Sequence, residues 1–322
     1  MSEDNDVLLD RDGAFTTITM NRPRRRNALS RGFLLALTDA FREVGATDAR
    51  GVILAANGPV FSAGHDFADM AGASHADVRD LLRVCTGLMQ TMQSIPQVVV
   101  ARVHGLATAA GCQLAASCDL AVAAESAGFA APGGKGGWFC HTPLVAIAHN
   151  IGRKRAAEMA LTGEVFSAAT AAEWGLINYA VPDDELDKAT RELLERATQG
   201  SPRSKALGKQ AMYAQFDRPE QDSYAYAIEV MAASSQTPRG PRGHDRLPGK
   251  TPPTLARLAH PQAPAHPNHQ APAHPNHQGA RGGAPRGRGG GAPTSGVRGS
   301  SPGSACRRSP AHAFRGHASA TP

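Results

Sequence analysis

Cysteine is scarce in this chain, with five among 322 residues. Cys85, Cys112, Cys118, Cys140 and Cys306 are odd in number, and no two of them form a CxxC pair. This pattern predicts neither a disulfide framework nor a zinc site, and no other metal site is expected. Buried free thiols are the expected state of these side chains.

Long apolar runs are also absent, because no stretch reaches the ~18 residues that a membrane-spanning helix needs. The first six residues, Met-Ser-Glu-Asp-Asn-Asp, are acidic and contain no apolar segment. Such a start is unlike a secretory signal peptide or a basic transit peptide. On these grounds the sequence predicts a soluble protein of the cytoplasm that does not enter a membrane.

Acidic residues nearly vanish from the C-terminal quarter. From Arg239 onward there are 12 Lys and Arg but one acid, so this tail carries about +11 and the residues before it about −5. Fourteen of the 23 prolines lie beyond residue 238, and the octapeptide at 263–270 is repeated at 271–278. Few large apolar residues accompany them, so residues 239–322 are predicted to be a disordered Pro/Gly/Arg/His-rich tail. Nucleic-acid binding through the Arg-Gly stretch at 281–290 is the weaker alternative, and no nucleic-acid partner is expected.

Residues 1–238 alternate between strand-like and helix-like patterns. Short apolar or β-branched runs at 14–20, 51–55, 97–103 and 118–123 predict strands. Apolar residues recur with helical spacing over 31–44 and 78–92, and from Pro143 the pattern is almost wholly helical. We therefore expect an α/β core followed by a helical subdomain.

Four ordered segments carry a more specific pattern. They are Asn21–Pro23 with Asn27–Leu29, Phe61–Phe67, His104–Asp119 with its Gly111-Cys112-Gln113-Leu114 turn, and Thr162–Pro182. Together they resemble the crotonase (enoyl-CoA hydratase/isomerase) superfamily, closest to its enoyl-CoA hydratase domain-containing protein 3 branch. The resemblance implies an α/β crotonase (ClpP-like) fold, with a repeated ββα spiral core over 1–182 and a helical trimerisation subdomain over 183–238. It also implies assembly as a homotrimer or hexamer.

The same resemblance implies that the chain binds an acyl-CoA thioester. The N–H groups of His65 and Ala110 would form an oxyanion hole, which stabilises the negative charge that develops on the thioester oxygen. Coenzyme A would be part of the substrate, and no separate cofactor is expected. The candidate contacts of the CoA thioester are Arg24, Arg26, Ala28, Ala63, Asp66 and Phe67. For the arginines a solvated loop remains an open alternative, and for Asp66 a cap of the next turn.

The two glutamates that hydration needs are missing. By the resemblance, hydratases place one at the position of Gln113 and the other at Gly133. An amide cannot take a proton from water and glycine has no side chain, so the usual acid–base pair is absent. His141 is a candidate replacement, although a histidine bonded only to the backbone is an open alternative. Two functions therefore remain: a lyase or isomerase with altered chemistry in fatty-acid metabolism, or a non-catalytic acyl-CoA-binding or regulatory protein.

The last helix that such proteins usually carry is absent from this reading frame. Arg242–Thr251 can be encoded by CGA GGG CAT GAC CGC CTT CCT GGA AAA ACG. Read one base later, these codons give Glu-Gly-Met-Thr-Ala-Phe-Leu-Glu-Lys, which resembles the missing helix. We therefore hypothesise that residues 239–322 are translated out of frame.

Overall fold

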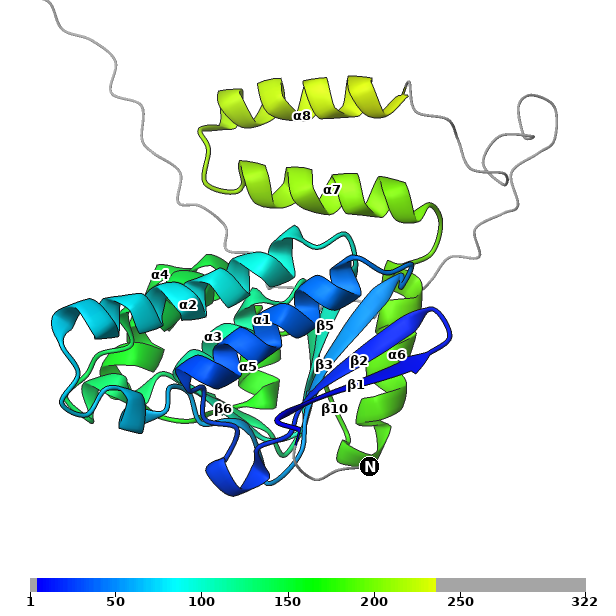
Figure 1. Ribbon diagram of the computed structural model, residues 1–322. Helices are drawn as coiled ribbons and strands as arrows, with labels where there is room; N and C mark the ends of the chain where they lie inside the picture. The colour runs from blue at the N-terminus through cyan, green and yellow to red at the C-terminus, as the bar shows by residue number, and fades with distance from the viewer. Residues whose placement is uncertain (1–4, 236–322) are drawn as a thin grey trace, which may run out of the picture. The chain divides into compact units, whose positions relative to one another are not determined.

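The computed structural model of the chain describes residues 5–235, all within one compact unit of the polypeptide (Figure 1). The strands are Val7–Asp12 (β1), Phe15–Met20 (β2), Gly51–Ala56 (β3), Val60–Ser62 (β4), Val98–Val103 (β5), Leu106–Thr108 (β6), Leu120–Ala124 (β7), Gly128–Ala130 (β8), Phe166–Ser167 (β9) and Tyr179–Val181 (β10). The α-helices are Arg31–Gly45 (α1), His75–Ser94 (α2), Ala110–Ser117 (α3), His141–Thr162 (α4), Ala168–Trp174 (α5), Leu186–Ala197 (α6), Pro202–Gln215 (α7) and Glu220–Ser235 (α8). Four short 3-10 helices lie at Pro23–Arg25 (η1), Phe67–Asp69 (η2), Pro132–Gly134 (η3) and Asp183–Glu185 (η4).

The strands form two sheets. The larger has the order β1-β2-β3-β5-β7-β10, and the smaller the order β4-β6-β8-β9. Strands β2, β3, β5, β7 and β10 pair in parallel, as do β4, β6 and β8. The expected α/β core is therefore confirmed.

The central strands are apolar because both faces of a parallel sheet are covered. All six residues of β3 are buried, and so are most of β5 and β7. Helices α1 and α2 lie side by side and turn their apolar stripes inward, as the helical spacing predicts (Figure 1). Ser30 caps the start of α1, and Ser74 and Asp77 form a capping box at α2.

The region after Pro143 is almost wholly helical, as predicted, apart from two short strands. Strand β10 adds a parallel edge to the larger sheet, and β9 pairs antiparallel with β8. These strands have only three and two residues, so they are too short for a period-two pattern to show in the sequence. Helix α6 packs against β3, β5 and β7. The predicted domain boundary at residue 182 stays a prediction.

Buried charges attach α7 to the core. Lys209 is 7% exposed and pairs with the Asp119 carboxylate at 2.8 Å. Its Nζ also donates to the carbonyls of Met92 and Gln97, while the Tyr213 hydroxyl donates to Asp119. Burial raises the pKa of Asp119 and lowers that of Lys209, and the mutual attraction opposes both shifts. Helix α8, by contrast, buries no residue within the chain.

The structure tests some of the remaining sequence predictions, and others concern residues outside the described range. Cys85, Cys112, Cys118 and Cys140 are free and buried, as predicted. No helix among residues 5–235 combines the length and the apolar character needed to cross a bilayer. Cys306, the tail at 239–322 with its repeats, and the hypothesised change of frame lie outside the described residues.

The Lys209→Met substitution is expected to destabilise the fold by about 3–5 kcal/mol, because it leaves the buried Asp119 carboxylate without its cation. Chemical denaturation would measure this loss. Lys205→Met is the matched control on α7, because Lys205 is exposed, and its effect should stay within about 0.5 kcal/mol. Equal effects of the two substitutions would contradict the anchoring role of Lys209.

Candidate active site

Three loops meet at one edge of the smaller sheet. Strands β4, β6 and β8 run parallel and are neighbours, so the segments that follow them emerge at the same edge. These segments are 63–66, 109–110 and 131–133. The carboxyl edge of parallel strands is the usual place for a ligand site in α/β proteins.

The first loop is held by the segment before α1. The Ala63 N–H donates to the Arg26 carbonyl at 3.0 Å, and the Leu29 N–H donates to the Gly64 carbonyl at 2.8 Å. The Asp66 N–H donates back to the Leu29 carbonyl at 3.2 Å. The His65 N–H lies between these bonds and has no acceptor among the described residues.

The second loop packs directly on the first. A Cβ built on Gly64 would lie 2.9 Å from the Thr108 carbonyl oxygen and 3.2 Å from the Ala110 nitrogen. A Cβ on Gly111 would lie 2.7 Å from the Ser62 Cβ and closer still to the Ser62 carbonyl oxygen. Real Cβ atoms do not approach so closely, so glycine is required at both positions. The backbones around His65 and Ala110 are thereby brought together.

The start of α3 presents a second unpaired donor. Ala109, just before the helix, has φ +52°, which is a strained conformation for alanine. Its N–H donates to the Ala130 carbonyl at 2.9 Å, which ties the second loop to β8. The N–H of Ala110, the first residue of α3, has no acceptor in the described part of the chain. The positive end of the helix dipole points the same way.

Both donors line one cavity of about 100 Å³. Its walls are mostly apolar and come from five parts of the chain. The lining residues are Ala63, His65, Phe67, Leu82, Ala109, Ala110, Gly133, Trp138, Phe139, Cys140, His141, Thr142 and Pro143. The indole ring of Trp138 packs against both His65 and Phe67, with ring centroids 6.1 and 6.4 Å apart.

The His65 side chain is buried in this cavity, with 8% of its surface exposed. Neither ring nitrogen has a hydrogen-bond partner within the described residues. Burial lowers the pKa of His65; the Leu29 backbone, outside normal hydrogen-bond geometry, and the Asp69 carboxylate oppose this shift. The ring is therefore biased toward its neutral form.

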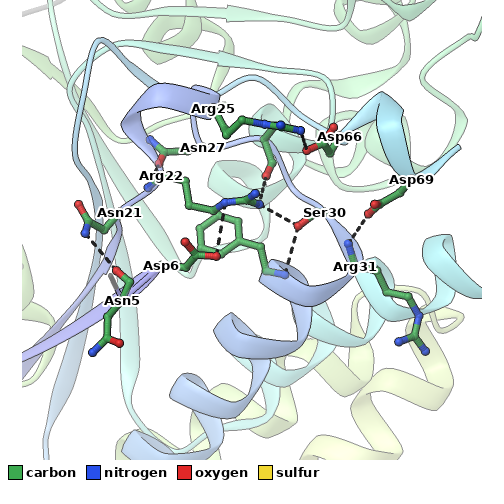
Figure 2. A network of polar contacts seen from close by, with 12 residues as sticks. Asn5, Asp6, Asn21, Arg22, Arg25, Asn27, Ser30, Arg31, Asp66 and Asp69 are labelled. Atoms are coloured by element: carbon green, nitrogen blue, oxygen red, sulfur yellow. Dashed lines mark hydrogen bonds and ion pairs between the residues drawn. The ribbon is translucent and has the colours of Figure 1, made fainter. Parts of the chain in front are cut away.

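An ion pair supports the first loop from outside the cavity. Arg25 donates to the Asp66 carboxylate at 2.7 Å, as Figure 2 shows, and Asp66 also caps η2 by accepting from the Ala68 N–H. Burial raises the pKa of Asp66, but these hydrogen bonds and the charges of Arg25 and Arg22 together lower it further than burial raises it. Asp66 thus takes the capping role that the sequence left open.

The basic cluster consists of Arg22, Arg24, Arg25 and Arg26. Two of these arginines hydrogen-bond within the fold, and two have no partner among the described residues. Arg22 donates to the Ala28 carbonyl and the Ser30 hydroxyl, so it joins η1 to the start of α1 (Figure 2). Arg24 and Arg26 are exposed, and their side chains have no partner in the described part of the chain. Neither of them lines the cavity, and nor does Ala28.

Of the two positions predicted for glutamates, only one belongs to the cavity wall. Gly133 lies in η3 and lines the cavity, whereas Gln113 is buried one turn into α3 and does not. The Gln113 Oε1 has no partner among the described residues. A Cβ on Gly133 would lie 2.8 Å from the Cys140 Sγ, and closer still to the Trp138 carbonyl oxygen. The backbone at 138–140 therefore occupies the space that a side chain at position 133 would need.

His141 begins α4 and lines the cavity, and its ring centroid lies 5.2 Å from that of Phe139.

The sequence did not predict Trp138 and Leu82 as residues of the cavity wall, or Arg25 as the partner of Asp66. Leu82 belongs to the predicted apolar stripe of α2, but the spacing did not show that this side chain faces the cavity. No group of three metal-ligating side chains occurs within residues 5–235.

Gly111→Ala is expected to destabilise the protein by about 1–3 kcal/mol, because its methyl group would push α3 away from Ser62. Gly87→Ala is the matched control, since a Cβ there meets nothing within 4 Å inside α2. That change should stabilise the helix by up to about 1 kcal/mol. Thermal denaturation of both variants checks the contrast, and a harmless Gly111→Ala would refute the close approach of the loops.

The chain is similar to known proteins. The family profile described as enoyl-CoA hydratase/isomerase matches residues 10–246. The rat enoyl-CoA hydratase domain-containing protein 3, mitochondrial, is 39% identical over 228 residues, which are 70% of this chain and 76% of the relative. Its zebrafish (Danio rerio) counterpart is 38% identical over 243 residues, covering 74% and 83%.

Solved structures show the same fold. A crystal structure of an enoyl-CoA hydratase from Mycobacterium smegmatis superposes with a TM-score of 0.71 at 42% identity, covering 73% of this chain and 93% of that one. The human enoyl Coenzyme A hydratase domain-containing protein 3 superposes with a TM-score of 0.67 at 35% identity, covering 71% and 91%. The predicted crotonase fold and the predicted branch are both confirmed.

The predicted cytoplasmic location is wrong by this comparison, because the rat and zebrafish relatives are named mitochondrial. That prediction rested on an acidic start without an apolar segment and on the lack of long apolar runs, and these features do not assign a compartment. The family profile matches residues 10–246, and a relative of 39% identity covers 70% of this chain, so the chain belongs to the enoyl-CoA hydratase/isomerase (crotonase) family.

Proposed function

We propose that the cavity binds an acyl-CoA thioester and polarises its carbonyl group. One observation carries this proposal: the N–H groups of His65 and Ala110 lack acceptors within the described residues, and both residues line the same cavity. A thioester carbonyl is a suitable acceptor for both. Membership of a family described as enoyl-CoA hydratase/isomerase supports the choice of ligand.

The arrangement favours a negatively charged thioester oxygen. When the α- or β-carbon of the acyl group reacts, electron density moves to that oxygen, and two fixed N–H donors stabilise it. The apolar walls exclude water and so strengthen these bonds. The N-terminus of α3 adds positive potential at Ala110. Gly64 and Gly111 hold the donors in place before any ligand arrives, so no reorganisation is needed.

The cavity supplies polarisation without the acid–base pair of a hydratase. No Asp or Glu is among its lining residues in the described part of the chain. Gln113 cannot serve as a base, and position 133 has neither a side chain nor room for one. We therefore propose binding of the thioester without hydration. Isomerase-type proton transfer by His141 is the second candidate, and the position of His141 on the cavity wall favours it.

Arg24 and Arg26 are proposed to contact the phosphates of CoA, because they are the unpaired members of the basic cluster at η1. The contacts of CoA with Ala28, Ala63, Asp66 and Phe67 stay predictions. A role in fatty-acid metabolism also stays a prediction.

The assembly as a homotrimer or hexamer is a further prediction. Helix α8 supports it, because Tyr224, Ile228 and Met231 are exposed on a helix that buries nothing within this chain.

Calorimetric titration with butyryl-CoA and with its S-butyl thioether analogue tests the carbonyl contact. Two hydrogen bonds of about 1 kcal/mol each predict that the thioester binds roughly thirtyfold more tightly. Crotonyl-CoA should bind without being hydrated, as measured by its ultraviolet absorbance. Equal affinities of the two analogues would contradict the oxyanion hole. If the protein instead isomerises an enoyl-CoA and His141→Ala abolishes that activity, the second candidate is established.

Restoring the two glutamates is expected to fail. Gln113→Glu should not give hydration, because Gln113 lies outside the cavity. Adding Gly133→Glu should distort the 138–140 backbone and reduce the affinity for butyryl-CoA. The absorbance assay and calorimetry on both variants measure this. Hydration by the double variant, at unchanged affinity, would show that the cavity has room for the usual acid–base pair.

A further inference from the structure

The His65 ring has a role that its backbone N–H does not explain. Seven buried side-chain nitrogen or oxygen atoms among the described residues lack a partner, and two of them are Nδ1 and Nε2 of His65. Of the residues that hold these seven atoms, His65 alone lines the cavity. The residue is over nine-tenths buried, and both ring nitrogens are buried. An unpaired buried polar group costs about 1–3 kcal/mol, so a partner from a ligand is favoured.

The cavity wall includes the polar side chains of Cys140, His141 and Thr142, but no group within the described residues hydrogen-bonds to the His65 ring. The ring packs against Trp138, and the apolar side chains of Phe67 and Leu82 line the same cavity. Asp66 is turned outward to Arg25, and its carboxylate is therefore already paired. A neutral imidazole has one N–H donor and one nitrogen acceptor, so it can bind a carbonyl or a hydroxyl group.

The ligand group that meets the ring should carry no charge. No Lys or Arg is among the lining residues of the cavity in the described part of the chain. A carboxylate would lose its hydration without gaining a fixed cation, and that loss is large in apolar surroundings. A hydroxyl or keto group has a smaller desolvation cost, and one hydrogen bond to the ring offsets it.

We propose that the His65 side chain is a specificity-determining group that selects acyl groups with an uncharged hydroxyl or keto substituent close to the thioester. The inference rests on the proposed function, because it takes the thioester oxygen to lie at the His65 N–H. The ring and that N–H belong to one residue, so the ring reaches only the first carbons of the acyl chain. His65 thus binds the thioester carbonyl with its backbone N–H and hydrogen-bonds to the substituent with its side chain.

Matched thioesters test this selection by calorimetry on the full chain. Butyryl-CoA is the reference, and 3-hydroxybutyryl-CoA and acetoacetyl-CoA carry the added group. The wild-type protein is expected to prefer the substituted ligands about tenfold, which corresponds to one buried hydrogen bond. His65→Phe should reduce the ratio to about one, while His65→Gln, which keeps a donor and an acceptor, should retain part of it. The ratio is taken within each variant, so a general loss of stability cancels.

The outcomes separate this inference from the proposed function. If none of the three thioesters binds the wild-type protein, the proposed function fails and the inference fails with it. If all bind the wild-type protein equally, the inference is overturned and the proposed function stands; this result needs no variant to fold. A preference that persists in His65→Phe would overturn the role of the ring. Tighter binding of malonyl-CoA than of acetoacetyl-CoA would overturn the requirement for an uncharged group.

Discussion

The site depends on the contact between the backbone after β4 and the first turn of α3. Two glycines make that contact possible, since a Cβ at either position would overlap the opposite backbone. Hydrogen bonds from Ala63, Leu29 and Asp66 hold one side, and the bond from Ala109 to Ala130 holds the other. The strained backbone of Ala109 persists because both of its flanks are fixed. Two N–H donors without acceptors result from this packing.

The segment from Gly133 to Cys140 determines what the site lacks. Its chain turns back on itself: the Lys135 and Trp138 N–H groups bond to the carbonyls of Pro132 and Gly133, and the Gly133 N–H bonds to the Cys140 Sγ. This tight turn fills the space beside Gly133 and at the same time places Trp138 against His65. The lack of room for a side chain at position 133 and the aromatic wall at Trp138 are therefore consequences of one backbone course.

Charges are used for structure in much of this fold. Asp119 with Lys209 attaches α7 to the core, and Arg25 with Asp66 supports the loop that carries His65. Arg22 joins η1 to α1 in the same way (Figure 2). Each of these residues has fixed partners within the described part of the chain. Among the described residues, the unpaired buried side-chain atoms that belong to the cavity wall lie on His65, beside the N–H donors of the two loops.

The sequence by itself determined strands β2, β3, β5 and β7, helices α1 and α2, the family, and the residues at positions 113 and 133, neither of which is a glutamate. These features depend on local patterns: apolar spacing, capping residues, and motifs whose glycines the backbone requires. The tertiary structure alone decided that Gln113 lies outside the cavity and that no side chain fits at position 133. It alone paired Arg25 with Asp66 and left both nitrogens of His65 unpaired. Such outcomes depend on contacts between residues far apart in the chain, and spacing along the sequence does not encode the direction of a side chain.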